Sequence, residues 1–291
     1  MADLDADGNP ELLSGSWPGE LFVFQGGPKR TFAAPEKLKN KDGKSVNCGG
    51  GVMQSGGDML LFAGDATTEQ KDGKTFILYE GERIEVPAGK SPGITGTASA
   101  LHAVDWDGDG DLDLLVGNIR GDVWLVPNEG TAKAHSFGKE QALTAGGAPV
   151  HVEGDAGPFC ADWDGDGDTD LLVGSGDGSV SLFRNTATKE SRAKGAPVLA
   201  ARETLVEKSK MDWSNPPAEP APGVRSKICA ADWNGDGRLD LLVGDFAQQK
   251  PAEAATSDSA RPKSKPGRES ENHGWVWLYL RTGPNTKTSA R

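Results

Sequence analysis

The feature that most constrains this chain is an acidic segment that recurs along it in register. The segment Asp105–Gly117 returns almost unchanged as Asp162–Gly174 and Asp232–Gly244, and a more divergent copy, Asp3–Gly15, opens the chain. Each copy has the form Asp-x-Asp/Asn-x-Asp-Gly-x-x-Asp/Glu and runs directly into a short, mostly apolar stretch that ends in glycine. Such repetition predicts a fold built from similar units that stack against their neighbours.

Short strands are predicted on both sides of each acidic loop. After the loop come a short apolar run, a glycine turn and a second run of alternating apolar residues, as between Asp113 and Val126, which is typical of a β-hairpin. Another short run precedes the loop, and a weaker fourth run follows the hairpin. The preceding runs are 100–104, 158–161 and 227–231, and the fourth runs are 137–143 and 197–206. Four antiparallel strands per repeat match the blade of a β-propeller.

We therefore predict an all-β fold, a single β-propeller domain over residues 1–291 with about five four-stranded blades. The gap between the first two acidic loops is nearly twice the later spacing, so we expect a second blade there that has lost its acids. Met59–Gly64 and Thr75–Tyr79 resemble two strands of that blade, and Gly49–Gly57 replaces its loop. The predicted blades are 1–46, 47–92, 93–146, 147–208 and 225–291.

The ends of the chain and two segments within it depart from the regular blade. The first blade lacks the strand before its loop, because Met1 lies just before Asp3, and the last blade has no clear fourth strand. We expect a truncated N-terminus, which also fits a truncated larger propeller. Residues 207–224 and 247–272 are rich in Pro, Lys and Glu and are predicted to be inserted loops, the second of them disordered.

The acidic loops have the residue types and spacing of a calcium site. Calcium takes about six to eight oxygen ligands, and acids at positions 1, 3 and 5 of a tight loop converge on one point. Glycine at position 6 lets the chain reverse, so that the carbonyl of position 7 and the acid of position 9 complete the site. We predict up to four Ca²⁺ sites. Their side-chain ligands are Asp3, Asp5, Asp7, Glu11, Asp105, Asp107, Asp109, Asp113, Asp162, Asp164, Asp166, Asp170, Asp232, Asn234, Asp236 and Asp240, and their backbone-carbonyl ligands are Asn9, Asp111, Asp168 and Arg238.

An EF-hand and a turn without metal are the alternatives to this kind of loop. An EF-hand requires glutamate at position 12 and flanking helices. Position 12 is Ser14, Val116, Val173 and Val243, all within strand-like runs, so an EF-hand is excluded. Asp-Gly turns without metal stay open as an alternative, although several uncompensated carboxylates in one loop repel each other. The two loops with five aspartates should bind calcium more tightly than those at Asp3 and Asp232, because they carry more charge.

The overall charge supports a local rather than a general role for the acids. The net charge is −12, with 43 acidic residues against 31 Lys and Arg, yet basic residues outnumber acidic ones outside the four loops. A nucleic-acid-binding protein needs a basic stripe, which the sequence lacks. No apolar run is long enough for membrane insertion. We therefore expect neither nucleic-acid binding nor membrane insertion.

At this point the pattern resembles the FG-GAP, or VCBS, repeat, the blade of integrin α-subunit propellers and of many bacterial secreted proteins. The resemblance rests on the acidic loops and on Val116-Gly117, Val173-Gly174 and Val243-Gly244. It implies calcium that rigidifies the blades, an extracellular, cell-surface or periplasmic location, and a role in adhesion or recognition. Two departures are the second unit, which lacks the loop, and Glu11, which replaces aspartate.

The sequence leaves two functions open. The favoured one is a non-enzymatic recognition, adhesion or scaffold module with an unknown protein or glycan ligand. The alternative is a polysaccharide hydrolase or lyase on the same scaffold, although no catalytic residue can be named and no G-x-S-x-G motif occurs. Cys48, Cys160 and Cys229 are interpreted as small buried residues, and one disulfide among them stays open.

Overall fold

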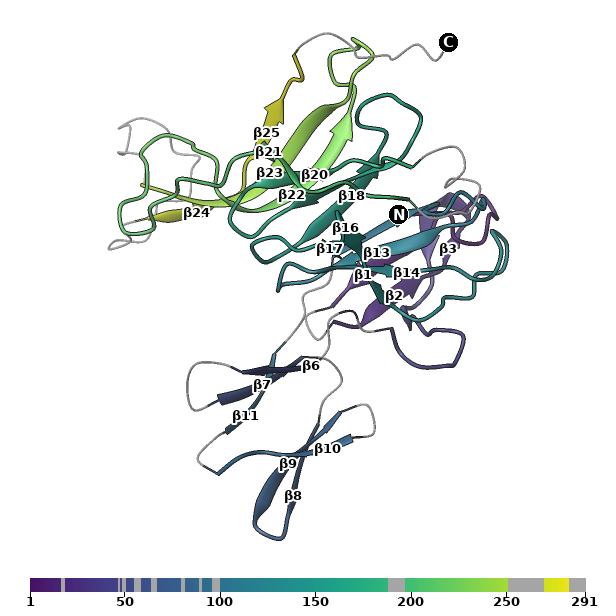
Figure 1. Ribbon diagram of the computed structural model, residues 1–291, viewed down its shortest axis with the longest axis vertical. Helices are drawn as coiled ribbons and strands as arrows, with labels where there is room; N and C mark the ends of the chain where they lie inside the picture. The colour runs from purple at the N-terminus through teal and green to yellow at the C-terminus, as the bar shows by residue number, and fades with distance from the viewer. Residues whose placement is uncertain are drawn as a thin grey trace.

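The computed structural model describes residues 1–16, 19–46, 48, 51–54, 59–63, 67–79, 82–88, 91–95, 100–187, 197–250 and 270–282. Within these residues the fold is all-β, as predicted, and the single helical element is a short 3₁₀ turn, η1 (Pro28–Arg30). Several separate, mostly antiparallel sheets make up the molecule (Figure 1). The described sheets do not form a closed barrel or propeller.

Four of the sheets follow the acidic repeats. The first sheet contains β1 (Leu12–Gly15), β2 (Leu21–Phe24) and β5 (Glu36–Lys37), with the small hairpin β3 (Gly26–Gly27) and β4 (Thr31–Phe32) beside it. The second contains β12 (Ala100–Val104), β13 (Asp113–Gly117), β14 (Val123–Val126) and β15 (Gln141–Ala142). A hairpin, β16 (Thr144–Ala145) and β17 (Ala148–Pro149), links it to the third sheet.

The third and last sheets repeat the second. The third contains β18 (Gly157–Ala161), β19 (Asp170–Gly174), β20 (Val180–Phe183) and β21 (Glu203–Val206). The last contains β22 (Val224–Ala231), β23 (Asp240–Gln249) and β25 (Val276–Tyr279), with β24 (Glu271–His273) on the far end of β23. The predicted strands on both sides of these acidic loops are confirmed, and the register is the same in each sheet. In the strand that follows the loop, the glycine of the Asp-Leu-Leu-Val-Gly segment lies opposite Ala100, Gly157 or Lys227.

The core lies between consecutive sheets. We call the face of a sheet that packs on the next sheet along the chain its forward face, and the opposite one its rear face. Leu114 and Val116 of β13 pack on the first sheet, whereas Leu115 between them packs on the third. All three side chains are fully buried, because a strand covered on both faces alternates between two apolar contacts. Burial of each such side chain contributes about 1.5–3 kcal/mol.

The glycines that end β13 and β19 let consecutive sheets approach each other closely. A Cβ atom added to Gly174 would lie 2.2 Å from the carbonyl oxygen of Ser226, and one on Gly117 would lie 2.2 Å from that of Ala156. Both oxygens belong to the chain that enters the next sheet. Gly244 holds the same position in the last sheet, but a Cβ there would meet only Lys227 of its own sheet, at 3.7 Å.

These contacts predict different outcomes for one substitution at two matched positions. Gly174→Ala should lower the free energy of unfolding by about 1–3 kcal/mol, because the added methyl group forces the third and last sheets apart. Gly244→Ala should change it by less than about 0.5 kcal/mol. Urea denaturation measures both, and equal losses would contradict the packing described here.

The segment between the first and second sheets differs from the predicted second blade. Met59–Gly64 and Thr75–Tyr79 were expected to share one sheet, which is wrong for their described residues. β7 (Met59–Ala63) pairs with β6 (Gly51–Gln54) and, in parallel, with β11 (Ser91–Thr95). The other strand lies within a separate sheet of β8 (Thr67–Lys71), β9 (Lys74–Tyr79) and β10 (Glu82–Glu85). Most of the predicted replacement loop, Gly49–Gly57, lies outside the described residues.

A tight turn explains this difference. Asp72 and Gly73, between β8 and β9, have φ angles of 50° and 72°, so β9 pairs with the strand just before it in sequence. Asp-Gly between two strand-like runs is a strong hairpin signal, and it outweighs the likeness of these runs to the repeat. Figure 1 shows the sheets of β6–β11 set apart from the stack, and the first and second sheets pack directly on each other through β1 and β12.

The inserted loops and cysteines agree with the sequence only in part. Residues 207–223 form an irregular loop, as predicted. The predicted loop 247–272 begins later, because β23 continues to Gln249 and pairs with β24; residues 251–269 lie outside the described chain. The hairpin of β23 and β24 is mostly polar and is held by backbone pairing, so the sequence shows no alternation of apolar residues that would predict it. The three cysteines are free; Cys48 and Cys160 are buried, but Cys229 is exposed.

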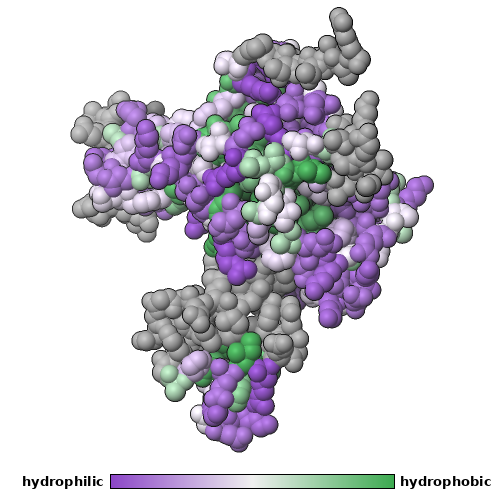
Figure 2. Space-filling model, viewed as in Figure 1, coloured by the Kyte–Doolittle hydropathy of each residue, from purple (hydrophilic) through white to green (hydrophobic). Residues whose placement is uncertain are grey.

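No helix among the described residues has the length and apolar character needed to cross a membrane. Hydrophobic residues are concentrated over the stacked sheets, and hydrophilic ones dominate the loops at the margins (Figure 2).

Candidate metal centre

The acidic loops share one local structure. The first aspartate accepts hydrogen bonds from two backbone amides of its own loop: Asp105 from Gly108 at 2.8 Å and from Gly110 at 3.1 Å. Asp162 does the same with the equivalent glycines, at 2.8 and 3.0 Å. The glycine at position 6 has a positive φ in all four loops, for example 96° at Gly110, which is the conformation expected of it.

These turns bring carboxylates together in three of the four loops. In each, one ligand oxygen from each of three acids lies within 4.8 Å of the other two. The acids come from positions 1, 3 and 9 of the motif. The groups are Asp105, Asp107 and Asp113; Asp162, Asp164 and Asp170; and Asp3, Asp5 and Glu11. The structure therefore brings together most of the side chains that the sequence singled out in these loops.

The acids at position 5 lie outside these groups. The carboxylate of Asp109 accepts the amide of Asp111 at 3.0 Å, and Asp166 accepts that of Asp168 at 2.9 Å. Asp7 does the same with Asn9 at 2.7 Å. Their role as ligands stays a prediction, as does that of the carbonyls at position 7.

The acid at position 9 has a structural role that sequence reasoning missed. Asp113 is buried, and its two oxygens accept the amide of Trp106 at 2.9 Å and that of Asn128 at 2.6 Å. It thereby ties the start of the loop to the chain that leaves β14. The same pair of bonds recurs at Glu11, Asp170 and Asp240. The available signal was that this acid lies at the start of a mostly apolar, strand-like run.

The electrostatics of the clusters favour a positive partner. Burial, with the charges of Asp109 and Asp113, raises the pKa of Asp111 to about 6. Burial also raises the pKa of Asp170 to about 6 and that of Asp113 above its usual range. One buried oxygen of Asp111, Oδ1, has no hydrogen-bond partner. The protein thus holds several carboxylates in places where ionisation is costly without a neutralising group.

One neighbouring position distinguishes the three clusters. The residue that follows the hairpin after each loop, directly after β2, β14 or β20, is Gln25 in the first sheet, Pro127 in the second and Arg184 in the third. Arg184 donates to Asp164 at 2.7 Å, and Gln25 donates to Asp5 at 2.8 Å. Proline has no donor to offer. The Asp105 loop is therefore the cluster whose carboxylates are most available to a cation, a distinction that the count of aspartates did not provide.

The loop at Asp232 has a positive charge of its own. Arg238 donates to Asp236 at 2.5 Å, and the side-chain amide of Asn234 donates to the same oxygen at 3.1 Å. The pKa of Asp236 is held below its usual range mainly by the bond from Arg238. Because Arg238 already neutralises one of its three carboxylates, this loop is the weakest of the four candidates.

The contact between Arg184 and Asp164 yields a prediction. Arg184→Leu, which copies the residue at this position in the last sheet, should tighten calcium binding by the Asp162 loop about thirtyfold. Removing a unit positive charge about 4 Å from a divalent cation relieves about 2 kcal/mol at the dielectric constant of water. Calorimetric calcium titration measures the change. Arg202→Leu is the control, because Arg202 pairs with Glu153 at 3.0 Å, outside the loop. Unchanged affinity in Arg184→Leu would show that the arginine does not oppose binding.

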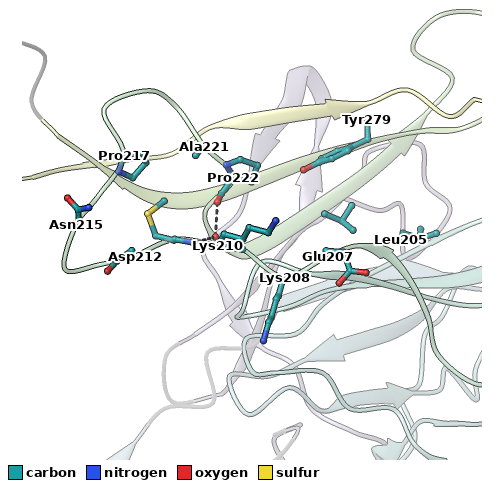
Figure 3. A pocket seen from close by; sticks show the side chains of 13 residues that line it. Leu205, Glu207, Lys208, Lys210, Asp212, Asn215, Pro217, Ala221, Pro222 and Tyr279 are labelled. Atoms are coloured by element: carbon teal, nitrogen blue, oxygen red, sulfur yellow. Dashed lines mark hydrogen bonds between the residues drawn. The ribbon is translucent and has the colours of Figure 1, made fainter.

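A groove lies beside the last sheet, away from the clusters. It encloses about 590 Å³ between residues 205–222 and β25, and its lining includes Lys208, Lys210 and Tyr279 (Figure 3). Its two acids, Glu207 and Asp212, lie at opposite ends in this view. A glycoside hydrolase requires two carboxyl groups that face each other across the scissile bond. The groove therefore gives the hydrolase alternative no support.

Comparisons with known proteins agree with the repeat. Residues 162–243 match the family of FG-GAP-like repeats, which confirms the resemblance noted from the sequence for this part of the chain. A search of curated proteins found no match. Among solved structures, the chain is similar to an Agrocybe aegerita lectin described as specifically recognising non-reducing terminal N-acetylglucosamine. The TM-score is 0.33 with 14% identity, covering 96% of this chain and 70% of that one. A TM-score this low does not establish a shared fold.

Proposed function

We propose that this chain is a calcium-stabilised module of the propeller type that serves in recognition, adhesion or as a scaffold outside the cell. One observation carries the proposal: the same loop gathers three carboxylates in each of three sheets. A single cluster of acids is a common surface feature. Its recurrence at the same position of three sheets favours a common role, which we propose is to bind a cation. FG-GAP-like repeats at 162–243 support the same interpretation.

The donor set suits a hard cation. Every candidate ligand is an oxygen, which calcium prefers over nitrogen or sulfur. Asp105, Asp107 and Asp113 would hold the ion in the second sheet, and the unpartnered oxygen of Asp111 adds to the negative field there. When bound, the ion supplies positive charge that neutralises the loop. The loop itself is held in place by the protein, because Asp113 joins the start of the loop to the chain that leaves β14.

The proposed arrangement places the four sheets that carry acidic loops side by side as propeller-type blades in sequence order, and in the last three of them the acidic loop joins the first two strands. The direct packing of the first, second, third and last sheets in sequence order supports this arrangement. Extracellular calcium-binding modules bind with dissociation constants of about 10⁻⁴–10⁻³ M, so loops of this kind suit compartments with millimolar calcium. Such loops therefore favour a location at the cell surface, in the periplasm or in the medium.

A binding screen tests the proposed role. The 291-residue chain is presented to a glycan array and to a panel of extracellular proteins, once with millimolar calcium and once with chelator. We expect binding to at least one glycan or protein that weakens when calcium is removed. Absence of binding in both conditions, or release of a sugar product from a polysaccharide, would contradict the recognition role.

A further inference from the structure

The forward face of the last sheet is uncovered, although its residues match those that are buried elsewhere. The residue at position 2 of the acidic loop lies on the forward face of each sheet. Trp106 and Trp163 are only 5% and 7% exposed there, because the next sheet covers them, whereas Trp233 is 62% exposed. The sequence repeats the tryptophan, but the described chain provides nothing that covers the third copy.

The third strand of the last sheet shows the same contrast. Val276 lies opposite Gly244, as Val123 lies opposite Gly117 and Val180 opposite Gly174. Val123 and Val180 are 1% and 0% exposed, but Val276 is 71% exposed. Leu278, two residues further along the same face, is also exposed, whereas its counterpart Leu182 is buried.

Two further residues of this face agree. Cys229 lies opposite Leu242, as Phe159 lies opposite Leu172 in the third sheet. Phe159 is half-buried whereas Cys229 is exposed, and Leu172 is fully buried whereas Leu242 is only half-buried. We call the set of Cys229, Trp233, Leu242, Val276 and Leu278 the open forward face. Gly244, where an added Cβ would meet only Lys227 of its own sheet, lies in the same sheet.

The complementary surface lies at the other end of the stack. Leu21 and Val23 of β2 point to the second sheet, so Phe22 and Phe24 point to the rear, together with Leu12 of β1. Leu12 is exposed, whereas its counterparts in the later sheets, Leu114, Leu171 and Leu241, are buried against the preceding sheet. We call Leu12, Phe22 and Phe24 the open rear face.

We propose that a second copy of this chain docks the open rear face of its first sheet on the open forward face of the last sheet. The chain makes this type of contact three times within itself, always forward face on rear face. The open rear face is the surface of this kind that the described residues leave uncovered at the opposite end of the stack. Two copies arranged head to tail cover both open faces at once, which closes the assembly.

The inference concerns packing and does not depend on calcium binding. Isologous pairing of two open forward faces, or coverage by an additional repeat in a longer chain, would also bury Val276 and Trp233. The head-to-tail proposal differs from both, because it alone requires Leu12 of one copy and Val276 of the other.

Sedimentation equilibrium of the 291-residue chain, in calcium, tests the proposal with two variants. Val276→Glu places a charge on the open forward face, and Leu12→Glu places one on the open rear face. Both side chains are exposed within a single copy, so neither change should prevent folding, which circular dichroism verifies. Val198→Glu, at an exposed position on neither face, is the matched control.

The expected results are a mass of two copies for the wild type and the control, and of one copy for each of the two variants. An equimolar mixture of Val276→Glu and Leu12→Glu should regain the mass of two copies, since each variant retains the face that the other has lost. A wild type that stays a single copy at the highest concentration would overturn the proposal. So would a Leu12→Glu variant that still pairs with itself, because that result indicates forward-to-forward docking.

Alkylation of Cys229 gives a second readout. Cys48 and Cys160 are buried, so a thiol reagent applied to the native chain reports on Cys229. Its rate should fall in proportion to the unassociated fraction as protein concentration rises, and it should stay constant in Val276→Glu. A wild-type rate that does not change with concentration would show that the open forward face is not the contact.

Discussion

Asp170→Ala should lower the free energy of unfolding by about 2–6 kcal/mol even without calcium, at about 1–3 kcal/mol for each buried amide that loses its partner. Asp170 is fully buried, and it accepts the amide of Trp163 at 3.0 Å and that of Asn185 at 2.7 Å. Alanine leaves both amides without a partner in a place that water does not reach. The loss is therefore structural and comes in addition to any effect on metal binding.

Urea denaturation in chelator measures this effect. The control is Asp166→Ala in the same loop, because Asp166 accepts a bond only within its own turn, from the amide of Asp168. We expect this second variant to lose less than about 1 kcal/mol, as is usual for a hydrogen bond near the surface. If the two variants lost equal stability, the assignment of position 9 as the residue that joins loop and strand would be wrong.

Calcium should raise the stability of the wild-type chain strongly. A ligand that binds only the native state adds about 2.7 kcal/mol per site at 100 times its dissociation constant. The three clusters should therefore increase the melting temperature by several degrees or more in about 10 mM calcium, given dissociation constants of about 10⁻⁴ M. Differential scanning calorimetry with calcium and with chelator measures the change.

Asp107→Asn keeps the shape of the side chain and removes one charge from the most available cluster. This variant should keep part of the calcium effect, because the clusters at Asp3 and Asp162 are unchanged. Magnesium should substitute poorly, since it requires near-ideal octahedral geometry and gives up its water reluctantly. A melting temperature that does not respond to calcium would count against binding to the folded loops.

The repeat allowed much of the fold to be predicted, because local pattern determines local structure here. Strands flank the acidic loops of the second, third and last sheets where the alternation and glycines placed them, and glycine at position 6 has the expected conformation. The segment with β7 and β9 departs from the predicted blade, because the turn at Asp72 and Gly73 pairs β9 with β8 despite its similarity to the repeat. A strand pairs with the nearest strand that is available, and a tight turn places the preceding strand of the chain beside it.

The candidate site was predictable in its residues but not in its energetics. Acid spacing identified Asp105, Asp107 and Asp113 as a group. It did not reveal that Asp113 also joins the loop to β14, because that contact depends on a residue far along the chain. Nor did it separate the two loops of five aspartates: the difference between Pro127 and Arg184 acts across the hairpin and requires its register.

The central claim is that the acidic loops bind calcium, and isothermal titration calorimetry tests it most directly. We predict three binding events per wild-type chain, from the clusters at Asp3, Asp105 and Asp162. The tightest event should disappear in the double variant Asp105→Asn, Asp107→Asn, while the other two remain. Absence of calcium binding at millimolar concentration, or an unchanged titration in the double variant, would contradict the account.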